Sequence, residues 1–168
     1  MINSIVRPAL IFVLLLLLQI LVFNNIQFSG YVNPYVYLMF IILLPVEMPA
    51  WILLLLSFAT GFIIDVFTGT PGMHAAATTL TGYIRPYILK VISPRDGYEP
   101  GATPSMVTYG FSWFLIYTIV LVAIHHLALF YLEVFRFADF FRTLLRVILS
   151  TLFSTSFIVL FELIRRGK

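Results

Sequence analysis

The sequence is poor in the residues that a water-soluble enzyme needs. It contains no cysteine, which excludes disulfide bonds, thiolate nucleophiles and metal sites with cysteine ligands. Aspartate, glutamate, lysine and arginine together make up only 10% of the chain, whereas a soluble domain carries about 25%. Without a charged coat, most of the molecular surface has to face lipid rather than water.

Hydrophobic residues dominate what is present. They make up 61% of the 168 residues, and the mean hydropathy is +1.05. A bilayer core of about 30 Å takes about 20 apolar residues per helix, so the chain has room for about six crossings and for no soluble domain besides. We therefore predict an all-α membrane protein, a compact bundle of about six transmembrane helices that forms a single transmembrane domain over residues 1–168.

Apolar runs and turn residues place these crossings. The predicted crossings are 9–23, 34–44, 51–67, 73–91, 106–127 and 142–164, and residues 131–141 are predicted to lie in the interface. The run 34–44 is shorter than a full span, so a five-crossing chain with a re-entrant second segment stays open. The first run ends in Phe-Asn-Asn without the small residues of a signal-peptidase site, so we predict a membrane helix there rather than a signal peptide.

Basic residues predict the orientation. They flank apolar runs, so the net charge of +3 marks topology rather than a nucleic-acid surface, and membrane lipid, not nucleic acid, is the expected contact. With six crossings, Arg136 and Arg142 fall on one side of the membrane. The other side receives Arg7, Lys90, Arg95, Arg165, Arg166 and Lys168. Because the richer side faces the cytoplasm, we predict a multi-pass inner-membrane protein with cytoplasmic N- and C-termini.

The stretch 61–74 is the most informative part of the sequence. Gly61 and Asp65 lie four residues apart and share a helix face, and a carboxylate near the end of an apolar helix faces protein or water. A turn follows, with Gly69, Pro71 and Gly72. Three interpretations of Asp65 stay open: a cap of the next helix, a partner for Arg85 or another group, and a catalytic or transport carboxylate.

Small residues recur at a spacing of four in the fourth run. Ala75 and Thr79 form one such pair, and Thr78 and Gly82 form another. This spacing lets a second helix approach the backbone closely, so both a subunit contact and packing inside the bundle fit. Arg85, in the same run, is predicted to snorkel toward the cytoplasmic headgroups.

Two histidines are adjacent, His125 and His126, and Glu133 follows seven residues after His126. Neighbouring residues on a helix point about 100° apart, so the pair lacks the i, i+4 spacing of zinc-binding helices. We interpret the histidines as interfacial anchors, and we expect neither a metal nor a cofactor. Because no nucleophile and base stand in a convincing arrangement, we predict that the protein is not an enzyme.

Charges alternate in sign in what we call the outer strip, which consists of Glu133, Arg136, Asp139 and Arg142. Residues three or four apart on one helix can pair, although such pairs contribute little on a wet surface. The strip also lies among several phenylalanines, which would suit docking of a periplasmic partner. Both interpretations stay open. Glu162 is predicted to form a local pair at the last helix end.

Taken together, these features resemble the MreD family of bacterial rod shape-determining membrane proteins. The resemblance covers nearly the whole chain and rests on its size, its helix count and the Gly-x-x-x-Asp and Gly-x-Pro-Gly pattern of Gly61, Asp65, Gly69, Pro71 and Gly72. It implies a non-enzymatic inner-membrane subunit of the cell-elongation (rod) complex, which scaffolds peptidoglycan synthesis and maintains cell shape. The implied partners are MreC, a bitopic periplasmic protein, and also RodA, a penicillin-binding transpeptidase and the actin-like MreB.

A second hypothesis follows from the fold that the resemblance implies. The family is similar in fold to the substrate-binding subunits of energy-coupling-factor transporters, which bind small vitamin-type molecules. Those subunits carry an Ala-x-x-x-Ala strip on the first helix, whereas residues 14–19 here read Leu-Leu-Leu-Leu-Leu-Gln. Such a function needs a polar pocket open to the outer face, to which Asp65, His74 and Asn33 are the candidate contributors.

Overall fold

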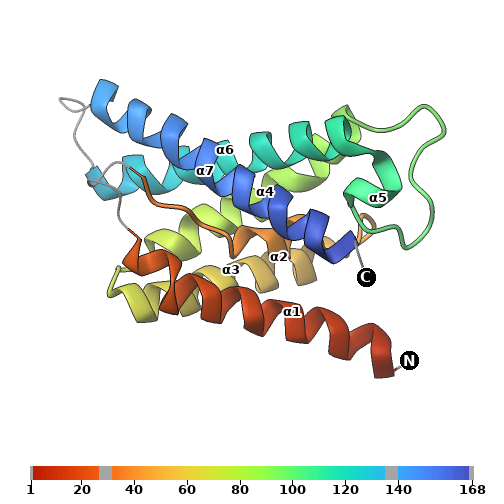
Figure 1. Ribbon diagram of the computed structural model, residues 1–168, viewed down its shortest axis with the longest axis horizontal. Helices are drawn as coiled ribbons and strands as arrows, with labels where there is room; N and C mark the ends of the chain where they lie inside the picture. The colour runs from red at the N-terminus through yellow and green to blue at the C-terminus, as the bar shows by residue number, and fades with distance from the viewer. Residues whose placement is uncertain (1, 27–31, 135–139, 167–168) are drawn as a thin grey trace.

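The computed structural model describes residues 2–26, 32–134 and 140–166, and their regular structure is helical (Figure 1). The elements are α1 (Ile2–Leu21), the short 3-10 turn η1 (Phe23–Asn25), α2 (Leu38–Ile42), α3 (Ala50–Thr68), α4 (Met73–Val91), α5 (Met106–Tyr109), α6 (Phe111–Val134) and α7 (Phe140–Arg166). Figure 1 shows the five long helices lying side by side in one bundle.

Four helices of the described part are long and apolar enough to cross a membrane, namely α1, α3, α6 and α7. Large apolar side chains such as Leu10, Leu55 and Leu152 are more than half exposed on their outer faces. In water this exposure would be unfavourable, whereas in a bilayer these side chains meet lipid tails. The chain is therefore a membrane-embedded, multi-pass, all-α protein.

Helix α4 is the centre of the bundle and packs against both α3 and α6 (Figure 1). Its bounds, Met73–Val91, are those predicted from the sequence. Helix α4 is not one of these four helices, and it carries a polar stripe, which includes Thr78, Thr81 and Arg85. All three of these side chains are buried inside the protein.

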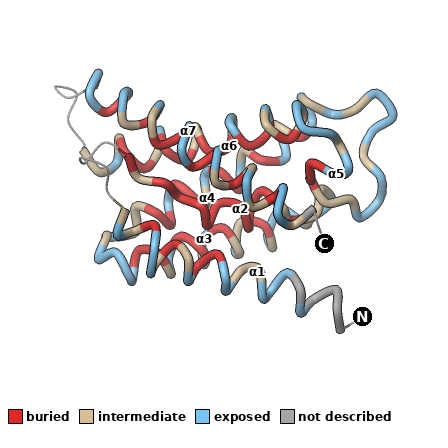
Figure 2. Tube along the Cα trace, in the orientation of Figure 1, coloured by how far each residue is buried: buried red, intermediate tan, exposed pale blue. Residues whose placement is uncertain are grey.

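The predicted helix over 34–44 is wrong. Only α2, a helix of five residues, forms there, and residues 32–37 are not helical. Pro34 lacks a backbone N–H and disfavours helical backbone at the residue before it. Figure 2 shows this segment as a continuous buried path through the bundle, and Tyr37 and Ile41 are fully buried. Protein surrounds the segment, which is the setting in which irregular backbone is tolerated at membrane depth.

Two other predicted boundaries change. The predicted helix 106–127 is split at Gly110, whose positive φ of 85° separates α5 from α6. In the segment 131–141, residues 131–134 end α6, residues 140–141 begin α7, and residues 135–139 lie outside the described part, so its interfacial location stays a prediction.

The long loop after α4 packs back on the bundle. The Tyr98 hydroxyl donates to the Leu89 carbonyl at 2.7 Å, and partial burial raises the pKa of this phenol above its usual value. The Val46 N–H donates to the Ala102 carbonyl at 2.9 Å, which ties the loop to the end of the buried segment.

Candidate functional site

Asp65 caps α4 across the hairpin that joins α3 to α4. Its Oδ1 accepts a hydrogen bond from the His74 N–H at 3.0 Å, and its Oδ2 accepts one from the Ala75 N–H at 2.8 Å. The Thr70 hydroxyl donates to Oδ1 at 2.5 Å. The carboxylate thus satisfies two N–H groups at the start of a helix and complements its dipole. The first of the three interpretations is the one that the structure supports, and Arg85 is not its partner.

The turn of this hairpin needs its glycines. Gly69 has a φ of 67° and Gly72 a φ of 80°, values that residues with a side chain rarely adopt. Gly69 ends α3 and Gly72 precedes α4, while Pro71 lies exposed between them. The turn pattern predicted from composition therefore has the local geometry that brings Asp65 over the start of α4.

The small residues of α4 pack inside the bundle. A Cβ built on Gly61 of α3 would lie 2.6 Å from the Ala75 Cα, so the two backbones are nearly in contact. A Cβ on Gly82 would lie 2.9 Å from the Ser57 Cβ of α3. Ala75 and Gly82 are buried because α3 packs against them, whereas Thr79 is only half buried. Of the two interpretations left open, packing within the bundle applies to Ala75 and Gly82.

A shallow apolar groove runs along the outer side of the α3–α4 contact, with a volume of about 600 Å³. Small residues of α4, including Ala76 and Thr79, lie in it. The rings of Phe58 and Phe62 on α3 stack at a centroid distance of 5.9 Å along one side. The groove is lined by Leu54, Phe58, Phe62, Gly72, Ala75, Ala76, Thr79, Leu80 and Tyr83. We call it the α3–α4 groove.

Polar side chains of α1 and α7 replace the hydrogen bonds that the buried segment 32–37 lacks. Gln19 of α1 is fully buried, and its Oε1 accepts from the Val36 N–H at 2.8 Å while its Nε2 donates to the Pro34 carbonyl at 3.1 Å. On the other side, Ser150 accepts from the Asn33 N–H at 3.0 Å and Ser154 from the Tyr35 N–H at 2.8 Å. Unpaired backbone groups at this depth would each cost several kcal/mol. These side chains therefore make an irregular crossing possible.

Arg85 holds the other end of the same segment. It is fully buried, and its guanidinium donates to the carbonyls of Leu44 and of Pro45, the latter at 3.3 Å. Its Nε donates to the Tyr117 hydroxyl at 2.8 Å, and that hydroxyl donates to the Ile42 carbonyl at 3.1 Å. The prediction that Arg85 snorkels to the headgroups is wrong, because its fork instead caps carbonyls beyond the C-terminus of α2.

The adjacent histidines also lie in the core, so their prediction as interfacial anchors is wrong. His125 Nε2 is 2.8 Å from the Tyr37 hydroxyl, and that hydroxyl is 3.1 Å from His74 Nδ1. His126 donates to the Val122 carbonyl at 2.7 Å. No three histidine or acidic side chains of the described ranges come close enough to hold a metal ion. Helix α6 is apolar on all sides, so the sequence does not reveal which side faces inward.

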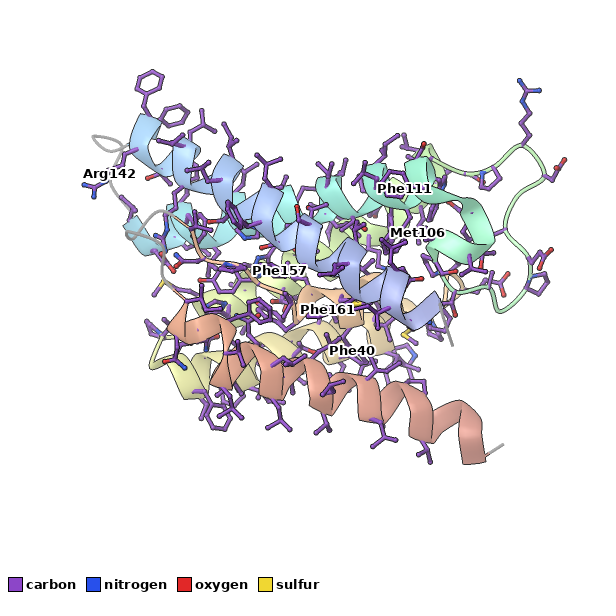
Figure 3. All side chains as sticks on the ribbon, in the orientation of Figure 1. Phe40, Met106, Phe111, Arg142, Phe157 and Phe161 are labelled. Atoms are coloured by element: carbon purple, nitrogen blue, oxygen red, sulfur yellow. The ribbon has the colours of Figure 1, made fainter. Side chains whose placement is uncertain are left out.

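The outer strip is not one helical face. Glu133 at the end of α6 pairs with Arg146 of α7 at 2.6 Å, and the Arg146 guanidinium lies 4.0 Å from the centre of the Phe130 ring. Arg142 is exposed at the start of α7 (Figure 3). Arg136 and Asp139 lie outside the described residues, so the docking interpretation of the strip remains a prediction. The local pair of Glu162 with Arg165 is confirmed, at 2.6 Å.

A cavity of about 210 Å³ with a largely polar lining opens at the hairpin end of the bundle. We call it the polar cavity. It contains the Glu133–Arg146 pair, and two of the three predicted pocket residues, Asn33 and His74, line it. The third, Asp65, does not. The lining consists of Phe23, Asn24, Asn33, Tyr35, Thr68, Thr70, His74, Glu133 and Arg146.

The sequence missed the roles of Gln19 and Arg85, although one signal for each was present. Each is a polar residue inside an apolar run, which marks a residue that faces protein rather than lipid. Comparison with known proteins adds nothing to this geometry, because no family model, no curated protein and no solved structure matches the chain.

Proposed function

We propose that the chain is a non-enzymatic inner-membrane subunit of the bacterial cell-elongation complex, of the MreD type. In this role it holds an MreC-like bitopic periplasmic protein next to the peptidoglycan synthesis machinery. The implied neighbours in that complex are RodA, a penicillin-binding transpeptidase and MreB. The protein then acts by contact, and its surfaces rather than a catalytic centre carry the function.

The observation that supports this proposal best is the α3–α4 hairpin. The motif behind the resemblance forms one structural unit, in which Gly61 admits the backbone of Ala75 and Asp65 caps α4 across the turn. Such a unit fixes two membrane helices rigidly against each other. Rigid packing of this kind suits a subunit that presents a surface.

We propose that the transmembrane helix of the bitopic partner lies in the α3–α4 groove. Helices associate in lipid where small residues let their backbones approach, and Ala76 and Thr79 provide such a surface beside the larger Phe58 and Phe62. Ala76 is exposed, unlike Ala75 and Gly82, so a second helix can reach it. The proposed partner surface is therefore centred on Ala76, one position along the chain from Ala75, which α3 already covers.

Replacing Ala76 by leucine should separate partner binding from folding. Leucine would fill the groove, and overpacking of this kind costs about 1–3 kcal/mol, so recovery of an MreC-like partner should fall about tenfold. The measurement is co-purification from the membrane, normalised to folded chain. Ala9→Leu is the matched control, because Ala9 is exposed on α1 away from the groove. Equal recovery with both variants would place the partner elsewhere, first of all on the outer strip.

The proposed topology has six crossings: α1, the buried segment 32–44, α3, α4, α6 and α7. With this count the hairpin and the polar cavity face the periplasm, and both termini are cytoplasmic, as the distribution of basic residues predicts. The segment 32–44 counts as a crossing because its two ends lie at opposite ends of the bundle (Figure 1).

A second candidate function is favoured by one observation, the polar cavity. A substrate-binding subunit of a small-molecule transporter needs such a cavity on its outer face, and Asn33 and His74 line this one. Copurification of a vitamin-type molecule in stoichiometric amount, without a bitopic protein, would favour this candidate over the scaffold.

A further inference from the structure

Two polar groups of residues that line the polar cavity, the Tyr35 hydroxyl and His74 Nε2, have no protein partner among the described residues. Tyr35 is 8% exposed and His74 is 2% exposed, and both line the cavity. Within the described ranges, neither the Tyr35 hydroxyl nor His74 Nε2 has a hydrogen-bond partner, whereas the Tyr37 hydroxyl and His74 Nδ1 are bonded to each other. The Tyr35 hydroxyl and His74 Nε2 are both open to the cavity rather than enclosed by protein, so they are available to a molecule bound there.

The hydrogen-bond network assigns His74 Nε2 the role of a donor. His125 Nδ1 has no partner in the described part, and an unpaired N–H is more costly there than an unprotonated nitrogen, so His125 carries its proton on Nε2. His125 Nε2 then donates to the Tyr37 oxygen, and we assign the Tyr37 proton to His74 Nδ1 at 3.1 Å, which is nearer than the Thr78 hydroxyl at 3.3 Å. With Nδ1 accepting, the remaining His74 proton is on Nε2 and can be donated to a ligand in the cavity.

The other walls offer both donors and acceptors but no net charge. Glu133 and Arg146 neutralise each other, and Arg146 Nε donates to the Asn33 side-chain oxygen at 3.1 Å when that amide is turned so that its oxygen faces the guanidinium. The Asn24 side-chain oxygen, Oδ1, accepts from Gln19 Nε2 at 2.9 Å, which leaves the protons of the Asn24 side-chain amide available. Phe23 and Tyr35 add aromatic surface. This mixture suits a molecule with several hydroxyl groups and an apolar ring face rather than an ion.

We infer that the polar cavity binds a neutral, hydroxyl-rich ring, that is, a single sugar unit. A volume of about 210 Å³ is below the range of about 300–1,000 Å³ of drug-sized sites, which suits a single ring rather than a larger ligand. The same chemistry is found in a free monosaccharide and in the sugar headgroup of a lipid. The inference concerns the isolated chain and does not require either the proposed partner or transport.

Binding of three small molecules to the purified chain tests this inference. The protein is kept in a detergent without a sugar headgroup, because a glycosidic detergent would compete for the cavity. Saturation-transfer NMR titrations compare N-acetylglucosamine, glycerol and zwitterionic glycine as probes. We expect the sugar to bind best and glycine not to bind. Failure of the sugar to bind, or stronger binding of glycine, would overturn the inference.

The variant Tyr35→Phe removes one hydroxyl group and retains the ring. Because that hydroxyl has no partner within the described part of the chain, folded yield should not change, whereas loss of one ligand hydrogen bond should weaken sugar binding about threefold to tenfold. Tyr87→Phe is the matched control, since Tyr87 is exposed on α4 outside the cavity. If Tyr35→Phe bound the sugar as tightly as the native chain does, the assignment of the sugar site to the polar cavity would be wrong.

A glycolipid distinguishes the two possible sources of the sugar, namely a free monosaccharide and the headgroup of a lipid. A monoglucosyl diacylglycerol presented in bicelles should displace N-acetylglucosamine at a much lower concentration than free glucose does if the natural ligand is a headgroup. Equal concentrations would assign the site to a free sugar. Failure of both to displace the probe would contradict binding in the cavity. None of these results depends on recovery of a bitopic partner, so the inference and the proposed function fail separately.

Discussion

Gly61→Ala should destabilise the protein by about 3 kcal/mol, the upper end of the usual cost of overpacking. The added methyl group would lie 2.6 Å from the Ala75 Cα and 2.7 Å from the Ala75 nitrogen. Both atoms belong to the backbone, so no side-chain rotation can relieve the clash and α3 and α4 must separate. The separation would also lengthen the hydrogen bonds from α4 to Asp65. The measurement is the free energy of unfolding in detergent micelles.

Gly82→Ala is the matched control on the same contact. Its methyl group would clash with the side chain of Ser57, at 2.9 Å from the Cβ, whereas the nearest backbone atom, the Leu53 carbonyl oxygen, is at an ordinary contact distance of 3.7 Å. Adding Ser57→Gly should therefore restore much of the stability that Gly82→Ala loses, whereas Ala75→Gly should not rescue Gly61→Ala. If Gly61→Ala were as stable as the native chain, the close approach of the two helices would be wrong.

Arg85→Met should lower the free energy of unfolding by about 2–4 kcal/mol. Methionine fills similar volume and removes a buried cation, which by itself would be favourable. The carbonyls of Leu44 and Pro45 and the hydroxyl of Tyr117 then lose their donor, and each unsatisfied buried group costs about 1–3 kcal/mol. Loss of these partners outweighs the gain from removing the charge.

Two further variants check this explanation. Lys90→Met removes a charge from an exposed position of the same helix and should change stability little. Arg85→Lys should lie between the native chain and Arg85→Met, because a single ammonium cannot match the planar fork that serves two carbonyls and a hydroxyl. Equal stability of Arg85→Met and Lys90→Met would contradict a capping role for Arg85.

The sequence allowed good predictions where structure depends on neighbours along the chain. The turn glycines predicted the turn, which is present, and a cap by Asp65 was one of three interpretations left open and is the one that the hydrogen bonds support. The bounds of α4 were predicted because polar loops flank it on both sides. Local chemistry determines a helix end, and local chemistry can be read from one sequence.

The residues of the core were less predictable because they depend on contacts between distant segments. Gln19 bonds to Val36, and Arg85 to Leu44, and nothing local indicates these pairs. A histidine such as His125 in a helix that is apolar all round gives no sign of the side that faces inward. The short run 34–44 was expected to be a helix because apolar composition alone does not distinguish a helix from an irregular segment surrounded by protein.

We propose that the irregular segment 32–44 crosses the membrane, supported by side chains of α1, α4 and α7. The orientation of the polar cavity and the cytoplasmic location of both termini follow from it. A re-entrant segment would instead return to the side on which it started, and the chain would have five crossings.

Single-cysteine labelling tests this claim directly, since the native chain contains no cysteine. Asn25 precedes the segment and Glu47 follows it, and both are exposed. With an impermeant maleimide added to spheroplasts, Asn25→Cys should be labelled at once, and Glu47→Cys only after the membrane is permeabilised. Labelling of both from the outside would contradict the crossing and, with it, the six-crossing arrangement.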